Sequence, residues 1–391
     1  MPIYLDNAAT ANPKAPGLAA AMARSLSDCN ANPGHGGHRL AVRATIAVYE
    51  ARAALAALLG VADPTRLVFT AGATAALNQA IWASLPGPGE VLCSAWEHNA
   101  VLRPLAAWRR RTGGSVLVLP PSGGQPLSVE AVERAITPAT RLIVLTAASN
   151  VTGAFNPVAE VGEIARRRGI RFLVDGSQTA GHLPSQLDAL PVDLWVTAGH
   201  KGLLGPQGIG VLYLRPGIEL EPLIRGGTGF HSEEEDHPAE LPEHLEAGTL
   251  NTPGILGLGA AAEFLLAQGP AQLRAREEQC TTALRDGLAR LAGVETFTAR
   301  TPRHGVGVVS CRLPNWSPAD AAAALDREFD IAVRSGLHCA PLAHRALGTA
   351  PEGTLRLSLG PFTTLDDIAA TLDALGRLLR RDPAEVRPHA G

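Results

Sequence analysis

Short apolar runs alternate along the chain with longer segments whose apolar positions recur at helical spacing. Short apolar runs bounded by turn residues are typical of buried strands, and the longer segments are typical of amphipathic helices. Strands that alternate with helices predict an α/β protein with a mainly parallel sheet. The predicted strands are 67–70, 91–93, 115–119, 142–146, 170–175, a run ending at 197, 209–214 and 305–313. The predicted helices are 42–59, 75–85, 129–136, 157–169, 253–268, 271–291, 318–329 and 365–379, and residues 1–40 are expected to be mostly irregular.

A lysine lies in the turn between two of these apolar runs, at Gly199-His200-Lys201-Gly202. Lysine is rare in this chain, which has only Lys14 and Lys201. In an apolar setting the pKa of a lysine falls and its amine becomes nucleophilic. Such an amine can bond covalently to a carbonyl, as pyridoxal phosphate enzymes require. The alternative is an ordinary turn lysine between two strands.

An aspartate ends the strand before this turn, in Ile170-Arg-Phe-Leu-Val-Asp175. A carboxylate there can pair with a protonated pyridine nitrogen and keep the ring an electron acceptor. Gly176-Ser177 follows, so Asp175 can equally be a helix cap. The order of Asp175 and Lys201, each at the end of a buried strand, favours the cofactor interpretation of both residues.

In this context the chain resembles the class V aminotransferase family, in particular its cysteine desulfurases and selenocysteine lyases. The resemblance runs from Tyr4-Leu-Asp-Asn-Ala-Ala-Thr10 to Arg356-Leu-Ser358. It implies the fold type I of pyridoxal 5′-phosphate-dependent transferases, with a large, mainly parallel sheet domain and a smaller C-terminal α/β domain. We expect residues 1–15 to pack with the small domain, 16–255 to form the large domain, and 256–391 to form the small one.

The same resemblance implies which residues bind the cofactor. A glycine turn that leads into a helix exposes N–H groups suited to a phosphate, although such turns are common in α/β proteins. The family places its phosphate there, and its other contacts are a histidine stacked on the ring, an amide near the ring oxygen and a residue that reaches the partner subunit's phosphate. Carried over, the set is Gly72, Ala73, Thr74, His98, Asn150, Asp175, Gln178, His200, Lys201 and Thr249. Ala198 stands where close relatives usually have a phosphate-binding serine.

The segment Arg334-Ser-Gly-Leu-His-Cys-Ala-Pro341 resembles the loop that carries the nucleophile of this family. Cys339 would then take the substrate sulfur as a persulfide, and His338 and Arg334 are expected to lower its pKa. The loop is short, like that of the branch that includes selenocysteine lyases. Lys201 and His98 would move protons, Asn150 and the guanidinium fork of Arg356 would hold the substrate carboxylate, and His35 would touch substrate. The alternatives are that Cys339 is an inert buried cysteine and that Arg356 lies on a solvated face.

Composition narrows the function classes only slightly. The net charge of −3 gives no sign of a nucleic-acid partner, and no apolar stretch is long enough to span a membrane. Five cysteines without framework spacing, and no visible signal peptide, predict a cytoplasmic protein. Without cysteine or carboxylate ligands close to His35 and His38, we expect no metal site.

The resulting expectation is a homodimer with composite active sites that converts L-cysteine to L-alanine, with L-selenocysteine as a second possible substrate and a protein as possible sulfur acceptor. One alternative is a class V aminotransferase or β-lyase in which Cys339 is a bystander. Another is a binding or scaffold protein on the same fold that uses the acidic segment 232–236. Fold alone does not choose among these functions.

Overall fold

The computed structural model describes residues 2–34, 36–121, 126–231 and 233–381. Its largest element is a seven-stranded sheet in the order β2-β8-β7-β6-β5-β3-β4. Only β8 runs antiparallel to its neighbours, so the sheet is mainly parallel, as predicted. The strands are β2 (Leu67–Thr70), β3 (Glu90–Ser94), β4 (Ser115–Leu119), β5 (Thr140–Thr146), β6 (Arg171–Asp175), β7 (Leu194–Ala198) and β8 (Gly210–Leu214).

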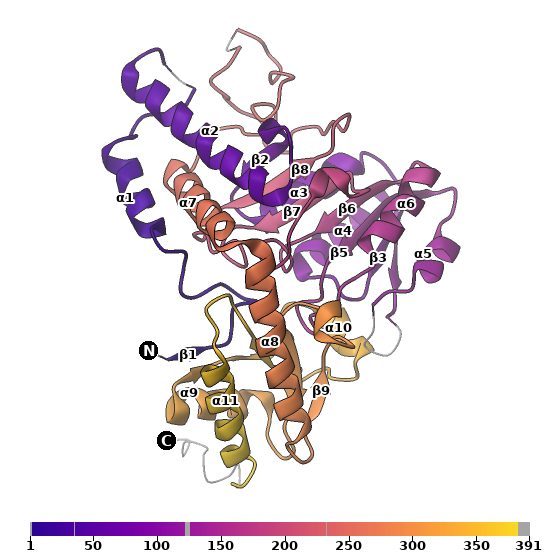
Figure 1. Ribbon diagram of the computed structural model, residues 1–391. Coiled ribbons are helices and arrows are strands. Elements are labelled where there is room, and N and C mark those ends of the chain that lie inside the picture. The colour runs from indigo at the N-terminus through magenta and orange to yellow at the C-terminus, as the bar shows by residue number, and fades with distance from the viewer. Residues whose placement is uncertain (1, 35, 122–125, 232, 382–391) are drawn as a thin grey trace, which may run out of the picture.

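Helices cover both faces of this sheet, because its central strands are apolar on both sides. One face packs against α3 (Ala73–Ser84) and α4 (Asn99–Thr112), with Trp108 fully buried. The other face packs against α2 (Arg39–Leu59), α5 (Val129–Ala135), α6 (Val158–Arg168) and α7 (Thr252–Gln268). The sheet and the helices on its two faces together form a three-layer α/β core (Figure 1).

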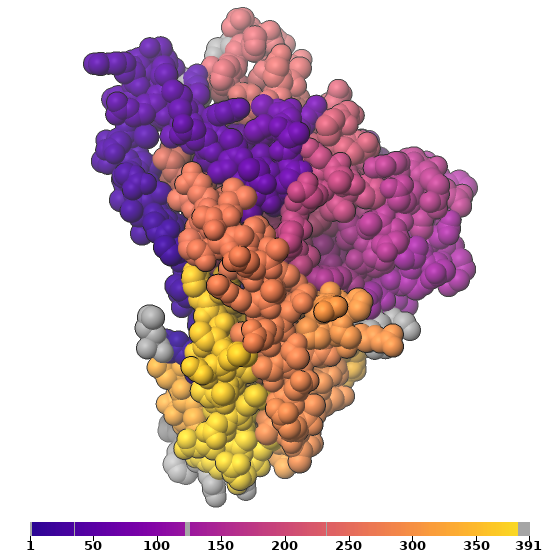
Figure 2. Space-filling model, in the orientation of Figure 1, coloured from indigo at the N-terminus to yellow at the C-terminus, as the bar shows by residue number. Residues whose placement is uncertain are grey.

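A second core forms around a four-stranded antiparallel sheet in the order β12-β13-β10-β9. Its strands are β9 (Glu295–Phe297), β10 (Val308–Arg312), β12 (Arg334–Gly336) and β13 (Thr354–Ser358), and its helices are α8 (Pro270–Ala289), α9 (Pro318–Phe329) and α11 (Leu365–Leu378). Figure 2 shows this C-terminal part, orange to yellow, lying against the indigo and magenta part of the chain.

The N-terminal segment joins this second core. Strand β1 (Ile3–Tyr4) pairs in parallel with β11 (Ile331–Ala332), and Leu5 is fully buried there. Asp6 forms a further bridge to Ser358. The segment therefore lies beside the strand that carries Arg356, which places it at the site described below.

The N-terminal region is mostly irregular, as predicted, but it contains one helix that the sequence analysis did not place. Residues 18–27 form α1 (Leu18–Ser27), which packs on α7. Its sequence is rich in alanine, and its buried positions are Leu18, Ala21 and Ser25. Alanine's high helix propensity favours this helix. Within the described part of the chain, no helix combines the length and the apolar character needed to cross a membrane.

Candidate active site

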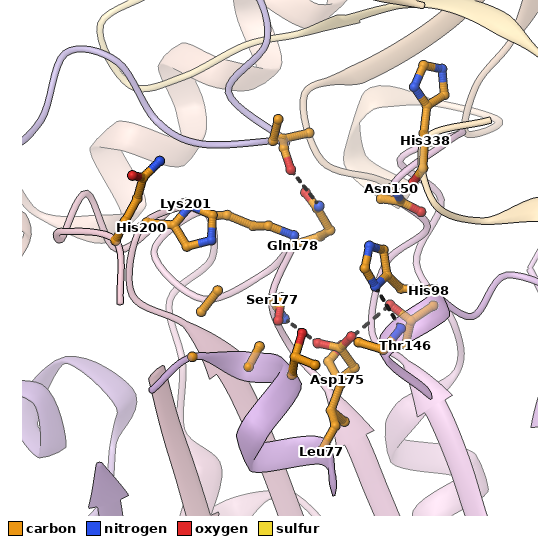
Figure 3. A pocket seen from close by; sticks show the side chains of 18 of the residues that line it. Leu77, His98, Thr146, Asn150, Asp175, Ser177, Gln178, His200, Lys201 and His338 are labelled. Carbon is orange, nitrogen blue, oxygen red and sulfur yellow. Dashed lines mark hydrogen bonds between the residues drawn. The ribbon is translucent and has the colours of Figure 1, made fainter. Parts of the chain in front are cut away.

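A cavity of about 450 Å³ opens where the parallel strands of the large sheet end. Open α/β sheets bind ligands at this edge because the loops there diverge. Figure 3 shows side chains from several elements around it, with Lys201, Asp175 and His98 on different sides. Ten predicted residues line the cavity: Gly72, Ala73, Thr74, His98, Asn150, Asp175, Gln178, His200, Lys201 and Arg356.

Lys201 lies in the tight connection between β7 and β8. Glycines let this connection fold against its neighbours: a Cβ on Gly202 would stand 2.4 Å from the Ala180 carbonyl oxygen. Burial lowers the pKa of Lys201, and the charge of Asp175 acts in the opposite direction. A lysine with a lowered pKa keeps more of its amine uncharged, which is the form that can attack a carbonyl.

Asp175 is the last residue of β6 and is 5% exposed. One carboxylate oxygen accepts a hydrogen bond from the Ser177 backbone N–H at 3.0 Å. The described residues that follow Asp175 form a turn and not a helix, so the helix-cap interpretation is wrong: the residue closes a turn and lines the cavity. Because the turn uses Oδ1, Oδ2 is the carboxylate oxygen left for a cationic ring nitrogen in the cavity.

His98 caps the N-terminus of α4, where its Nδ1 accepts from the Ala100 backbone N–H at 3.0 Å. An accepting Nδ1 assigns the proton of the neutral ring to Nε2. Burial, assisted by the charge of Lys201, lowers the pKa of His98 to about 4. The imidazole is thus neutral at pH 7, and its Nε2–H is the group it can offer to a ligand.

The end of the cavity at α3 suits a phosphate. Gly72 is the N-cap of this helix and supplies no capping side chain, so the first-turn N–H groups remain for a ligand. Two buried polar atoms of residues that line the cavity, Ser177 Oγ and His200 Nδ1, have no hydrogen-bond partner among the described residues. These donors fit the phosphate and ring of pyridoxal phosphate. Thr197, which could replace the serine lost at Ala198, does not line the cavity, whereas Ser177 does.

Cys339 lies at the rim of the cavity and is exposed. Both His338 and Cys339 have positive φ angles, +47° and +58°, which are uncommon for residues other than glycine. Two hydrogen bonds hold this conformation: Asn150 Nδ2 donates to the His338 carbonyl at 2.6 Å, and the Asn99 N–H donates to the Cys339 carbonyl at 2.8 Å. The loop is therefore docked on the ends of the large sheet.

The two predicted neighbours of the thiol differ in what they contribute. Arg334 lines the cavity, and its Nη2 lies 3.9 Å from Cys339 Sγ. His338 was expected to help to lower the Cys339 pKa, and this expectation is wrong. Its ring is buried beside Thr354, and burial lowers its own pKa to about 2, so it carries no positive charge at pH 7. Arg334 is the cation that faces the thiol.

Arg356 is 1% exposed and lines the cavity from β13. Its Nη2 donates to Asp6 Oδ1 at 2.6 Å and its Nη1 donates to the Asn150 carbonyl at 3.1 Å. Its Nε is buried without a partner among the described residues. Asp6 and Asn150 thus fix the guanidinium plane with two of its five N–H donors, and Nε is among the donors that remain.

Of the predicted site residues that the structure describes, Cys339 and Thr249 do not line the cavity; Cys339 lines a neighbouring open hollow. Thr249 is exposed and lies in a different hollow, beside Leu223 and Ile224. His35 lies outside the described residues. Gln178 lines the cavity, but its amide Nε2 donates to the Ala8 carbonyl at 3.0 Å.

Sequence reasoning missed four contributors: Asp6, Lys14, Ser177 and Gln207. Lys14 Nζ donates to the His200 carbonyl at 2.8 Å, and its rarity in the chain was a signal that could have found it. No cluster of three or more metal-ligating side chains occurs in the part of the chain that the structure describes.

Comparison with known proteins agrees with this geometry. Residues 3–371 match the family model described as aminotransferase class-V. The chain is 34% identical to a probable cysteine desulfurase of Methanothermobacter thermautotrophicus, covering 94% of this chain and 92% of the relative, and 33% identical to cysteine desulfurase CsdA of Escherichia coli, covering 96% and 94%.

Solved structures give the same result. The apo cysteine desulfurase of Thermococcus onnurineus superposes with a TM-score of 0.90 at 30% identity, over 97% of this chain and 95% of that one. The S-sulfonic acid form of CsdA from E. coli superposes with a TM-score of 0.87 at 31% identity, over 97% and 94%. The predicted fold is confirmed, and pyridoxal 5′-phosphate is the cofactor of this family. The chain belongs to the class V aminotransferase family, in its cysteine desulfurase group.

Proposed function

We propose that this protein is a pyridoxal phosphate-dependent cysteine desulfurase that converts L-cysteine to L-alanine and takes the sulfur on Cys339. The observation that carries the proposal is the placement of two nucleophiles. Lys201 lines the cavity, and the exposed Cys339 lies at its rim beside Arg334. The cofactor, when bound, supplies an electron sink for the carbanion that forms on the substrate.

The residues on the lysine side act on the cofactor and on protons. When the cofactor is bound, the first turn of α3, with Ser177 and His200, would hold its phosphate, and Asp175 would pair with its ring nitrogen. Lys201 would hold the cofactor covalently, and its amine would move protons on the substrate. The neutral His98 would contact the cofactor and share in the proton transfer through Nε2.

The residues on the thiol side act on the substrate. Arg356 Nε is a buried donor without a partner among the described residues, and Asn150 Nδ2 has a second N–H besides the one it donates to the His338 carbonyl; these donors would bind the substrate carboxylate. Arg334 places a guanidinium beside the Cys339 thiol, with Nη2 3.9 Å from Sγ. The Cys339 thiolate attacks the substrate sulfur, so an S–S bond forms and the C–S bond breaks. The electrons of the broken bond stay on carbon, which takes a proton and becomes the methyl group of alanine.

We also propose that two chains form a homodimer through the face that carries Thr249. Large apolar side chains are exposed around it, with Ile224 69% and Leu223 46% exposed, and Tyr49 56% and Ile46 52% exposed on α2. Exposed apolar residues that gather on one face favour a protein interface. Sedimentation should give a dimer for the wild-type protein and a monomer for Ile224→Glu. A monomeric wild-type protein would contradict this assembly.

Replacing Cys339 by serine tests the function. The wild-type protein, loaded with cofactor and given L-cysteine, should form alanine and a persulfide that mass spectrometry maps to Cys339. Cys339→Ser should keep the cofactor and lose the persulfide, and Cys29→Ser, at a cysteine that is only partly buried, is the control.

Each alternative gives a different result. Keto acid formed without sulfide, and unaffected by Cys339→Ser, would favour an aminotransferase. Absence of cofactor binding would favour a scaffold protein. L-selenocysteine in the same assay, scored as selenide and alanine, gives the ratio of kcat/KM for the two substrates.

A further inference from the structure

A buried cluster of charged side chains lies outside the cavity, where the two cores meet. Helix α8 begins in the core of the large sheet with Leu273 and continues into the second core with Cys280. Glu277 lies between them on α8 and is 5% exposed, and Arg274 and His182 beside it are 8% and 9% exposed. Charged groups are rarely buried to this extent unless they are paired. The function proposed above uses none of these three charged residues.

The carboxylate of Glu277 has hydrogen-bond partners on three sides. Its Oε1 accepts from Arg274 Nη1 at 3.1 Å and from the Gly307 N–H at 2.7 Å, and its Oε2 lies 2.5 Å from His182 Nδ1. Burial acts to raise the pKa of Glu277, but the charges and hydrogen bonds of His182 and Arg274 hold it below its ordinary value. An ionised carboxylate can only accept, so His182 Nδ1 carries the proton. A residue of α8 therefore fixes the orientation of the His182 ring.

The other edge of the His182 ring lies against the turn that carries Lys201. A Cβ on Gly202, the residue after Lys201, would stand 2.4 Å from His182 Cδ2 and 2.7 Å from its Nε2. Gly181 approaches the same turn, since a Cβ there would stand 2.1 Å from the Gly202 carbonyl oxygen. Such close packing leaves the turn no room to move towards His182. The His182 ring therefore limits where the Lys201 backbone can lie.

Glu277 also holds the strand that pairs with the strand of Arg356. Gly307, whose N–H donates to Glu277, immediately precedes β10. In the four-stranded sheet, Ser310 of β10 lies opposite Arg356 of β13. One buried carboxylate is therefore connected both to the Lys201 turn, through His182, and to the sheet that carries Arg356.

We propose that His182 is a positioning residue which, held by Glu277, sets the place of Lys201 relative to Arg356. The inference rests on the proposed function, in which Lys201 moves protons on a substrate whose carboxylate Arg356 binds. Both residues must fit one small molecule at the same time, and a misplacement of about 1 Å can cost about 100-fold in rate. His182 itself does not line the cavity, so it acts through the Lys201 turn.

Two substitutions at His182 test the role of its hydrogen bond. His182→Ala removes the ring and the bond to Glu277, whereas His182→Asn keeps an N–H donor near the place of Nδ1. In the holoenzyme given L-cysteine, His182→Ala should lower kcat for alanine formation about 10- to 100-fold and change KM by less than about threefold, because the binding groups remain. His182→Asn should recover kcat to within about threefold of the wild type, because it keeps the bond.

Two further measurements do not depend on turnover. The visible circular dichroism of the bound cofactor reports its surroundings at Lys201, and it should change in His182→Ala and stay close to the wild type in His182→Asn. Hydrogen exchange of residues 199–204 should become faster in His182→Ala. In Glu277→Gln, which keeps the size of the side chain and serves if His182→Ala does not fold, exchange of residues 305–308 should become faster as well. Tyr213→Phe loses one hydrogen bond to a carboxylate, that of Asp188 at 2.8 Å, and as the matched control should leave every measurement unchanged.

A wild-type kcat in both His182→Ala and Glu277→Gln would overturn the positioning role, and so would an equal loss of kcat in His182→Asn and His182→Ala. If the wild-type holoenzyme forms no alanine from L-cysteine, the proposed function fails instead, and the two results are distinguishable.

Discussion

The lysine side and the thiol side of the cavity are built in different ways. Asp175 and Lys201 come from the ends of adjacent strands of one sheet, and backbone close to each residue fixes it. The thiol side comes from the four-stranded sheet and a loop with two positive φ angles, and distant residues hold it: Asn99, Asn150 and Asp6. We infer that damage to the lysine side removes the cofactor chemistry, whereas damage to the thiol side weakens single steps.

Removing the amine on the lysine side should have the largest effect. Lys201→Ala deletes both the covalent attachment point and a proton-transfer group, and a general acid–base group alone contributes about 10²–10⁴-fold to rate. We expect alanine formation to fall by at least that factor. Borohydride reduction of the wild-type holoenzyme followed by peptide mapping should label Lys201. A label on another residue, or a Lys201→Ala variant with normal turnover, would refute the whole assignment.

On the thiol side, Arg356→Lys should have a smaller effect of a different kind. A charge-assisted hydrogen bond contributes about 1.5–3 kcal/mol, so loss of the guanidinium geometry should raise KM for L-cysteine by about 10- to 100-fold. The visible absorbance of the bound cofactor should be retained and serves as the folding control. An unchanged KM would assign the carboxylate to Arg334 instead.

The same difference between the lysine side and the thiol side explains which site residues could be predicted from the sequence. Strand ends and glycine turns are local patterns, so Asp175 and Lys201 were predicted from single segments, whereas the roles of His98, Gln178 and His200 came from the family resemblance. Asp6 was missed because its partner, Arg356, is 350 residues away. The role of His338 was predicted wrongly because a sequence shows that a histidine adjoins a cysteine, but not that its ring turns away into a buried contact with Thr354. The direction in which each side chain of this loop points, and whether it is buried, is decided only in the folded protein.

A substitution at Thr354 removes a contact that supports the Cys339 loop and leaves the reacting groups unchanged. Thr354 is fully buried, and its hydroxyl lies 3.1 Å from His338 Nε2. Thr354→Val keeps the shape and removes this bond, whose typical contribution is about 0.5–1.5 kcal/mol. Persulfide formation on Cys339 should slow by about 2- to 10-fold, with cofactor affinity unchanged. Thr371→Val on α11 loses a comparable buried hydroxyl far from the cavity and serves as the control. Slower cofactor binding in Thr354→Val would contradict the independence of the two sides.

The smallest effect on turnover is expected at Glu97, where the change concerns stability and its pH dependence. Glu97 is fully buried; its Oε1 accepts from Ser94 Oγ at 2.5 Å and from the Thr146 N–H at 3.0 Å. Burial raises the pKa of Glu97 to about 8, so the carboxyl is neutral at pH 7. Glu97→Gln keeps an oxygen for both donors, and the folded state should change little.

The pH dependence then tests the protonation of Glu97. Between about pH 4.5 and 8 the folded wild-type protein holds a proton that the unfolded chain has lost, so this group makes stability fall as pH rises. Glutamine cannot ionise, so the variant lacks this pH dependence. The free energy of unfolding of Glu97→Gln, relative to that of the wild type, should therefore rise towards pH 8 by up to about 1.4 kcal/mol per pH unit. Urea unfolding from pH 5 to 8 measures the difference, with Glu263→Gln on α7 as an exposed control. A difference that stays constant over this range would mean that Glu97 is ionised in the fold, and that the lysine side rests on a buried charge after all.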